Sequence, residues 1–158
     1  MRKIMVGALC GLMLILLLGC QSSGNGSTQK MSFGGDSMVP TFTNGEKVTV
    51  DTQAYVSSQP QRGDIIVFKD ESGVAMIKRV IGLPGEQIEI KDGKVYVNGK
   101  EITENYLNKQ NSTESSGNSV WKIPDKNVFV MGDNRAGSKD SRSIGPIPYD
   151  RILGKVVK

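Results

Sequence analysis

Hydrophobic residues in this chain recur in short runs separated by glycine, proline and asparagine, a pattern that predicts β-strands. Residues 47–51 alternate between apolar and polar side chains, and residues 152–157 form a last short apolar segment. Residues 64–68, 74–81 and 127–131 are nearly continuous apolar runs, typical of strands buried on both faces. No long stretch with helical periodicity occurs in the body of the chain. We therefore expect a mainly β protein built from coiled antiparallel sheets.

Two turn signals lie in the middle of the chain. Asp92-Gly93 separates the alternating segments 87–91 and 94–98, and a primed two-residue turn requires positive φ at both of its central residues. Asn98-Gly99 has the same chemistry and predicts a second tight turn. The polar segment 108–118, which is rich in serine and asparagine, predicts a mobile surface loop.

The N-terminus has the pattern of an export signal. Two basic residues precede the apolar run 4–18, which as a helix would span about 22 Å, short of the roughly 30 Å hydrocarbon core of a bilayer. This length favours a signal peptide over a spanning helix. The run ends in Leu17-Leu18-Gly19-Cys20, which is similar to a bacterial lipobox, in which the cysteine is lipidated. The alternative is a short, tilted membrane anchor that is not cleaved.

The rest of the chain divides into a tether and one domain. Residues 1–20 are expected to form the lipoprotein-type signal or membrane anchor, and the polar residues 21–31 a flexible tether. Residues 32–158 are long enough for one domain with a hydrophobic core but not for two. Under either reading of the N-terminus, this domain is expected outside the cytoplasmic membrane and attached to it.

Composition removes several classes of function. The net charge is +4, and basic and acidic residues alternate without a basic stripe that contains aromatics, so nucleic acid is not an expected partner. Weak attraction to anionic membrane lipids stays open. Both cysteines lie in the N-terminal segment and the chain has no histidine, so we expect neither a disulfide in the domain, nor a metal, nor a cofactor.

The absence of histidine also excludes a Ser-His-Asp triad, and a serine nucleophile would need a different base. Ser37 follows Gly34-Gly35 and precedes Val39-Pro40, a setting in which the backbone can approach a ligand closely. Taken alone, Ser37 reads as an ordinary loop serine.

Lys78 is the candidate base. It lies in an apolar run where Met76, Lys78 and Val80 would share one face of a strand. Burial lowers the pKa of a lysine by disfavouring its charged form, and a neutral amine can accept a proton. The alternative for Lys78 alone is a surface lysine whose stem is buried and whose amine reaches solvent.

Three blocks, residues 34–41, 77–85 and 132–142, resemble the type I signal peptidase (leader peptidase) family of membrane-bound Ser/Lys proteases. The resemblance runs from about Gly34 to the C-terminus, and the family pattern Gly-Asp-Asn-Arg-x-x-Ser-x-Asp-Ser-Arg is complete in the third block. It implies the signal-peptidase fold and a serine endopeptidase that removes signal peptides from exported preproteins at the outer face of the cytoplasmic membrane. The lipobox departs from the family, whose members usually carry uncleaved membrane helices.

The resemblance also assigns roles to individual residues. It makes Ser37 the nucleophile and Lys78 the general base, with the Ser138 hydroxyl hydrogen-bonded to the Lys78 amine. It further implies two ion pairs that shape the site, Asp140 with Arg142 and Asp133 with Arg79.

Substrate is expected to bind as an extended strand along a sheet edge, with small side chains flanking the scissile bond. Gly35, Met38 and Pro40 are the expected substrate contacts. Some family members have a hydroxyl residue at the position of Gly35, so only backbone donors are available there to bind an oxyanion. Phe42 stands where leucine is common and is expected to reshape the wall of the pocket.

Two other classes of function remain as alternatives. One is a non-catalytic, membrane-anchored accessory protein of pilus or envelope assembly with the same fold, which loss of Ser37 or Lys78 would have favoured. The other is a self-cleaving domain like those of SOS repressors, which carry a DNA-binding module that this chain lacks. The expected partners are therefore the signal peptides of exported preproteins and membrane lipids.

Overall fold

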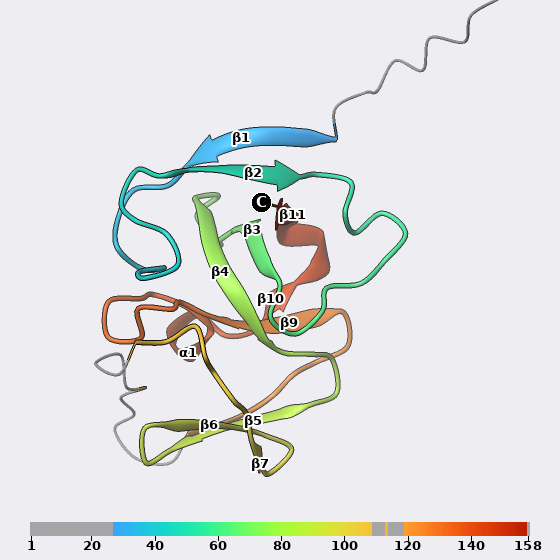
Figure 1. Ribbon diagram of the computed structural model, residues 1–158. Helices are drawn as coiled ribbons and strands as arrows, with labels where there is room; N and C mark the ends of the chain where they lie inside the picture. Colours follow the sequence, from blue (N-terminus) through green and yellow to red (C-terminus); the bar gives the residue numbers. More distant parts are fainter. Residues whose placement is uncertain (1–26, 109–112, 114–118, 158) are drawn as a thin grey trace, which may run out of the picture.

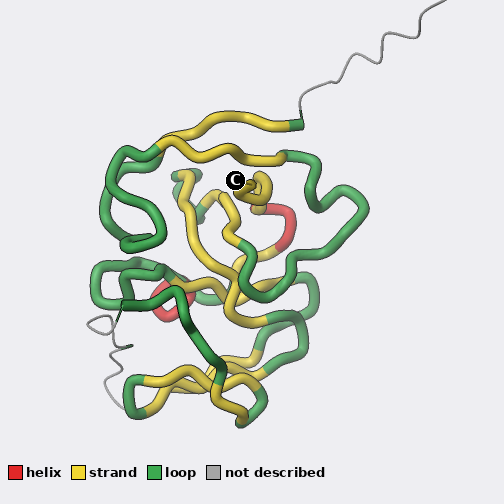
Figure 2. Tube along the Cα trace, viewed as in Figure 1, coloured by secondary structure: helices red, strands yellow, loops and turns green. Residues whose placement is uncertain are grey.

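The structure, a computed structural model, describes residues 27–108, 113 and 119–157, and its regular elements are almost all β-strands (Figure 2). The strands are β1 (Thr28–Ser32), β2 (Lys47–Asp51), β3 (Ile65–Lys69), β4 (Ala75–Gly82), β5 (Gln87–Lys91), β6 (Lys94–Val97), β7 (Lys100–Glu101), β8 (Ser119–Lys122), β9 (Asn127–Met131), β10 (Ile147–Pro148) and β11 (Ile152–Val157). Two short helical elements accompany them, α1 (Ser141–Ile144) and the 3-10 turn η1 (Tyr149–Arg151).

The strands form two antiparallel sheets (Figure 1). The larger has the order β1-β2-β11-β3-β4-β9-β10, and the smaller has the order β7-β6-β5-β8. The larger sheet is strongly curled, with β1 and β2 at one end of the molecule and the small sheet at the other. The prediction of a mainly β fold with coiled antiparallel sheets is therefore confirmed.

The two predicted turns have the expected backbone. Asp92 and Gly93 have φ values of 49° and 74°, and Asn98 and Gly99 have φ values of 50° and 79°. Both central residues of each turn thus lie in the left-handed region, which aspartate, asparagine and glycine tolerate best. These turns connect β5 to β6 and β6 to β7.

The predicted tether is too long at its C-terminal end. β1 lies within it and pairs antiparallel with β2, with Lys30 opposite Thr49. Met31 is the one residue of β1 that packs against the core, so the pattern of apolar and polar residues does not predict this strand. Backbone hydrogen bonds to the edge of β2 form this strand. The folded region therefore begins before residue 32.

Several expectations fall outside the described residues. These are the signal or anchor over 1–20, Cys20 itself, and all of the predicted loop 108–118 except Asn108, which is exposed, and Thr113, which is buried. Among the residues that are described, there is no helix of the length and apolarity that crossing a bilayer requires.

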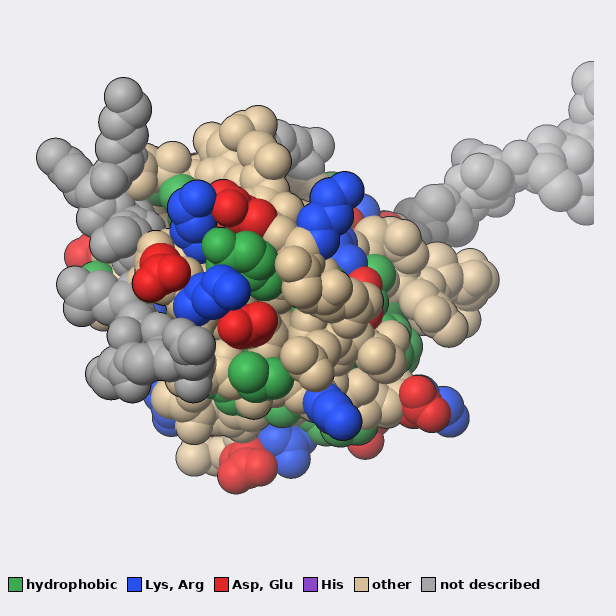
Figure 3. All heavy atoms as spheres, turned by 90° about the horizontal axis from the view of Figure 1, so that it is seen from below, with side chains coloured by type: hydrophobic (Ala, Val, Ile, Leu, Met, Phe, Trp, Pro, Cys, Tyr) green, Lys and Arg blue, Asp and Glu red, His purple; other side chains and the backbone are tan. Residues whose placement is uncertain are grey.

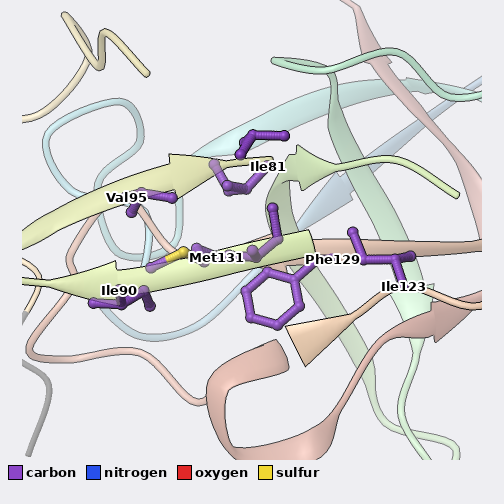
Figure 4. Packing of buried hydrophobic residues seen from close by; sticks show 8 residues of the cluster. Ile81, Ile90, Val95, Ile123, Phe129 and Met131 are labelled. Carbon is purple, nitrogen blue, oxygen red and sulfur yellow. The ribbon is translucent and has the colours of Figure 1, made fainter. Parts of the chain in front are cut away.

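Among the described residues the hydrophobic core falls into three clusters. Figure 4 shows the first, in which Ile81, Phe129 and Met131 of the large sheet pack against Ile90 and Val95 of the small one. Another, the site-side cluster, joins Met38 to Val50, Val67 and Ile77. Because Met38 is 3% exposed, this packing fixes the chain next to Ser37.

Charges of both signs are mixed on the surface. On the face seen in Figure 3, lysine and arginine side chains lie among acidic ones and hydrophobic ones. In the small sheet, Lys94 Nζ lies 3.0 Å from Glu101 Oε2 in an exposed ion pair. The face in Figure 3 therefore has no extended field of one sign.

Candidate active site

Ser37 lies in the loop between β1 and β2, and the third sequence block holds that loop in place. The Asn134 N–H donates to the Ser37 carbonyl oxygen at 3.0 Å, and Asn134 Nδ2 donates to the Asp36 carbonyl oxygen at 3.1 Å. Gly35 has a φ of 93°, which other residues rarely adopt. The Val39–Pro40 peptide bond is cis. Residues about 98 positions apart in sequence thus form one local structure.

Lys78 lies on β4 opposite Ile66 of β3 and is only 3% exposed. Its Nζ is 2.8 Å from Ser37 Oγ and donates to the Ile77 carbonyl oxygen, also at 2.8 Å. The apolar run that predicts β4 therefore carries its lysine inward, with the amine against the serine hydroxyl. The alternative of a surface lysine does not hold for this residue.

Burial changes the protonation of this amine. Desolvation lowers the pKa of Lys78 to about 8, although the carboxylates of Asp140 and Asp133 act in the opposite direction. When the amine is neutral, the Ser37 hydroxyl can donate its proton across the same contact. The pair can therefore act chemically as a serine nucleophile and its base.

Arg79 and Asp133 form a buried bidentate ion pair beside this contact. Arg79 Nε lies 2.9 Å from Asp133 Oδ1, and Arg79 Nη2 lies 2.6 Å from Asp133 Oδ2. The Thr41 hydroxyl also donates to Asp133 Oδ2, and Arg79 Nη1 donates to the Gly63 carbonyl oxygen at 3.0 Å. The pair joins β4 to the segment after β9, and Thr41 links both to the loop of Ser37.

Asp140 and Arg142 form the second ion pair that the resemblance implied. Asp140 is fully buried and accepts from Arg142 Nε at 2.8 Å, from Arg142 Nη2 at 2.9 Å and from the Gly132 N–H at 2.9 Å. It is also the N-cap of α1. Arg142 Nη2 donates in turn to the Arg135 carbonyl oxygen at 2.6 Å. One carboxylate therefore holds together both ends of the third block.

The expected hydrogen bond between Ser138 and Lys78 is not formed. Ser138 Oγ is buried and has no hydrogen-bond partner among the described residues, whereas the Lys78 amine bonds to Ser37 and Ile77. Ser138 is nonetheless close to the site, because a Cβ added at Gly132 would clash with both Ser138 Oγ and the Ser37 carbonyl oxygen. Glycine at 132 is what allows these two segments to approach.

The residues expected to contact substrate differ in position. Gly35 and Met38 line a small pocket beside Ser37, with Phe42 in its wall, whereas Pro40 is exposed and does not line it. The pocket is lined by Phe33, Gly34, Gly35, Ser37, Met38, Phe42, Thr43, Glu46, Val48 and Ile77. The Gly35 N–H donates to Asn44 Oδ1 at 3.0 Å and is therefore not a free oxyanion donor.

Sequence reasoning missed a second layer of residues around the site. Arg135 is buried and pairs with Glu104, and Tyr106 lies against Arg79. Arg135 lies in a block that the sequence analysis singled out, but it received no role. Glu104 and Tyr106 follow the last tight turn in a segment without regular periodicity, so no sequence signal marked them. Among the described residues, no cluster of three or more histidine, cysteine, aspartate or glutamate side chains is placed to hold a metal ion.

A serine hydroxyl in contact with a buried lysine amine is the arrangement used by serine peptidases that lack a catalytic histidine. Similarity to known proteins points to one family. The model of the family described as signal peptidase, peptidase S26, matches residues 6–158. Signal peptidase I T of Bacillus subtilis (strain 168) is 41% identical over 129 residues, covering 76% of this chain and 67% of the relative. Signal peptidase IB of Staphylococcus aureus (strain COL) is 39% identical over 137 residues, covering 77% and 72%.

Solved structures give the same result. The crystal structure of a signal peptidase I from Enterococcus faecalis V583 matches with a TM-score of 0.56 and 34% identity, covering 64% of this chain and 98% of that one. The chain belongs to the signal peptidase family, peptidase S26.

Proposed function

We propose that this chain is a type I signal peptidase, a serine endopeptidase that cleaves signal peptides from exported preproteins with Ser37 as nucleophile and Lys78 as general base. The observation that carries the proposal is the 2.8 Å contact between Lys78 Nζ and Ser37 Oγ at an amine that is only 3% exposed. The proposal of a non-catalytic accessory protein is less well supported, since nothing in such a role requires this contact.

In the proposed reaction, the neutral Lys78 amine takes the hydroxyl proton as Ser37 Oγ attacks the scissile carbonyl carbon. The protonated amine then gives that proton to the leaving amine, and the acyl group stays on Ser37. A water molecule activated by Lys78 then hydrolyses the ester and releases the acyl group from Ser37. The Ser37 N–H has no acceptor among the described residues, which leaves it able to donate to the oxyanion. The Arg79–Asp133 and Asp140–Arg142 pairs hold this arrangement in place.

The pH dependence of cleavage tests the proposal. Because the base must be neutral and burial lowers the pKa of Lys78 to about 8, kcat/KM for a preprotein substrate should rise about tenfold per pH unit below pH 8 and level off above it. The measurement is cleavage of a preprotein by the full chain between pH 6 and 10, with the new N-terminus sequenced. Failure to cleave at the signal-peptide junction, or a rate that falls from pH 6 to 8, would refute the assignment.

We also propose that the domain lies on the extracytoplasmic side of the membrane and is held there by a lipid on Cys20. Cys20→Ala should then abolish incorporation of a clickable fatty acid and leave the precursor at full length. Parent and variant are compared in labelled cells, with Cys10→Ala as the matched control, which should label like the parent. A parent that takes up no label and retains Met1 would instead support an uncleaved membrane anchor.

A further inference from the structure

A segment from the small-sheet side of the molecule contacts two arginines of the site, Arg79 and Arg135. It comprises residues 102–107, which follow β7. Tyr106 contacts Arg79 on β4, and Glu104 contacts Arg135 in the segment after β9. We call these two side chains the clasp. Tyr106 also packs against the first core cluster, so the segment is fixed at its base.

Tyr106 completes the environment of Arg79. The edge of the Arg79 guanidinium donates to Asp133 and to the Gly63 carbonyl oxygen, and its face lies over the Tyr106 ring, with Cζ 4.0 Å from the ring centroid. Such cation–π contacts are strongest where water is excluded, and Arg79 is only 9% exposed. Burial and the neighbouring Glu104 carboxylate raise the pKa of Tyr106, so its ring is a neutral phenol.

Glu104 gives Arg135 the corresponding support. Its two carboxylate oxygens accept from Arg135 Nη1, at 3.1 Å, and from Arg135 Nη2, and the Tyr106 hydroxyl donates to Glu104 Oε1 at 2.5 Å. Arg135 Nε donates to the Gly132 carbonyl oxygen at 3.1 Å. The Arg135 side chain is 1% exposed, so Glu104 supplies the counter-charge that a buried guanidinium requires.

Each of the two arginines is connected in turn to a member of the Ser37–Lys78 pair. Arg79 holds Asp133, whose charge acts on the Lys78 amine. Arg135 fixes the chain at Gly132, two residues before Asn134, whose N–H binds the Ser37 carbonyl oxygen. The clasp therefore contacts neither Ser37 nor Lys78 but touches the groups that hold each of them.

We infer that Glu104 and Tyr106 are positioning residues for the Ser37–Lys78 pair, by which the small sheet contributes to catalysis without touching substrate. The inference rests on the proposed function, since it assumes that this pair does the chemistry. The clasp would thus help to set the relative positions of the Ser37 hydroxyl and the Lys78 amine.

The test replaces the ring with a smaller aliphatic side chain. Tyr106→Leu retains an apolar side chain against the core but has no aromatic face, and Tyr106→Phe retains the face. The matched control is Tyr96→Leu, because the Tyr96 ring makes a similar contact with Lys91 Nζ, 4.9 Å from its centroid, on the small sheet. We expect Tyr106→Leu to lower kcat about 10²-fold, as misplaced catalytic groups do, with KM changed less than about threefold. Tyr106→Phe should keep most of the rate, and Tyr96→Leu should match the parent.

A second readout needs no activity. Tyr106→Leu uncovers one face of Arg79 and admits water to the site, so burial disfavours the charged Lys78 amine less and the pKa of Lys78 should rise. This is measured by NMR titration of the Lys78 side chain. In the same samples, amide exchange at Asn134 should become faster than in the Tyr96→Leu control. If Tyr106→Leu does not fold, Glu104→Gln, which removes the charge and keeps the shape, is measured in the same three ways.

The outcomes separate the two proposals. If the parent does not cleave a preprotein, the proposed function fails, and the Lys78 titration and the Asn134 exchange still decide whether the clasp positions those groups. If the parent cleaves and Tyr106→Leu matches Tyr96→Leu in kcat, in the Lys78 titration and in exchange, the positioning role is wrong. A loss of folding stability with kcat and the Lys78 titration unchanged also overturns it, because the clasp would then be structural only.

Discussion

Ser37→Ala and Lys78→Ala are each expected to lower kcat/KM for preprotein cleavage by at least about 10⁴-fold, because each removes a group that reacts in the chemical step. The two losses should not add in the double variant, since a nucleophile and its base act as a unit. Neither substitution should prevent folding. Ser37 is a loop residue, and Lys78→Ala removes an amine whose desolvation already disfavours its charged form.

The measurement is the initial rate of cleavage by purified full chain, with the thermal midpoint recorded for each variant. Suitable matched controls are Ser72→Ala and Lys91→Ala, a serine and a lysine at positions outside the site, which should leave the rate unchanged. Preparations from a host whose own signal peptidase is inhibited or absent exclude contamination. A folded Ser37→Ala or Lys78→Ala variant that retains more than about one-hundredth of the parent rate would refute the assigned chemistry.

Asp140→Ala is expected to give the largest loss of stability, about 3–5 kcal/mol in the free energy of unfolding. Asp140 is fully buried, and its removal leaves the Arg142 guanidinium without its counter-charge and the Gly132 N–H without its acceptor. The α1 N-cap is lost as well. The loss is large because the charge left behind is poorly solvated, whatever the net contribution of the intact pair.

Chemical denaturation followed by a spectroscopic signal measures this difference. Glu101→Ala is the control, since it breaks the exposed Lys94–Glu101 pair, and it should change the free energy of unfolding far less than Asp140→Ala does. Equal losses in the two variants would show that burial does not set the effect. Residual activity of Asp140→Ala should also extend to lower pH, because the Asp140 carboxylate raises the pKa of Lys78 and its removal takes that contribution away.

The parts of the fold that sequence predicted are those that local chemistry determines. Apolar runs gave β3, β4 and β9, and the Asp-Gly and Asn-Gly pairs gave two turns because few residues tolerate positive φ. β1 escaped prediction because pairing with β2 forms it, and backbone pairing leaves little trace in side-chain pattern.

The candidate site divides in the same way. Ser37 and Lys78 were found through motifs, and the structure brings them within 2.8 Å. The predicted hydrogen bond between Ser138 and Lys78 is not formed. A motif specifies which residue is present, but it does not specify the rotamer on which a side-chain hydrogen bond depends. Glu104 and Tyr106 were missed because their contacts with Arg135 and Arg79 depend on tertiary packing between distant segments. No local sequence pattern predicts such contacts.

If the domain is attached to a membrane through Cys20, as proposed, the pairing of β1 limits the distance between the domain and the bilayer. The Thr52 N–H donates to the Ser27 carbonyl oxygen at 2.7 Å, so the chain is already fixed to the domain at residue 27. A lipid on Cys20 would leave only the residues between 20 and 27 as a linker to the membrane, and this linker could span at most about 25 Å when fully extended. The β1 end of the domain would then stay within one protein diameter of the membrane surface.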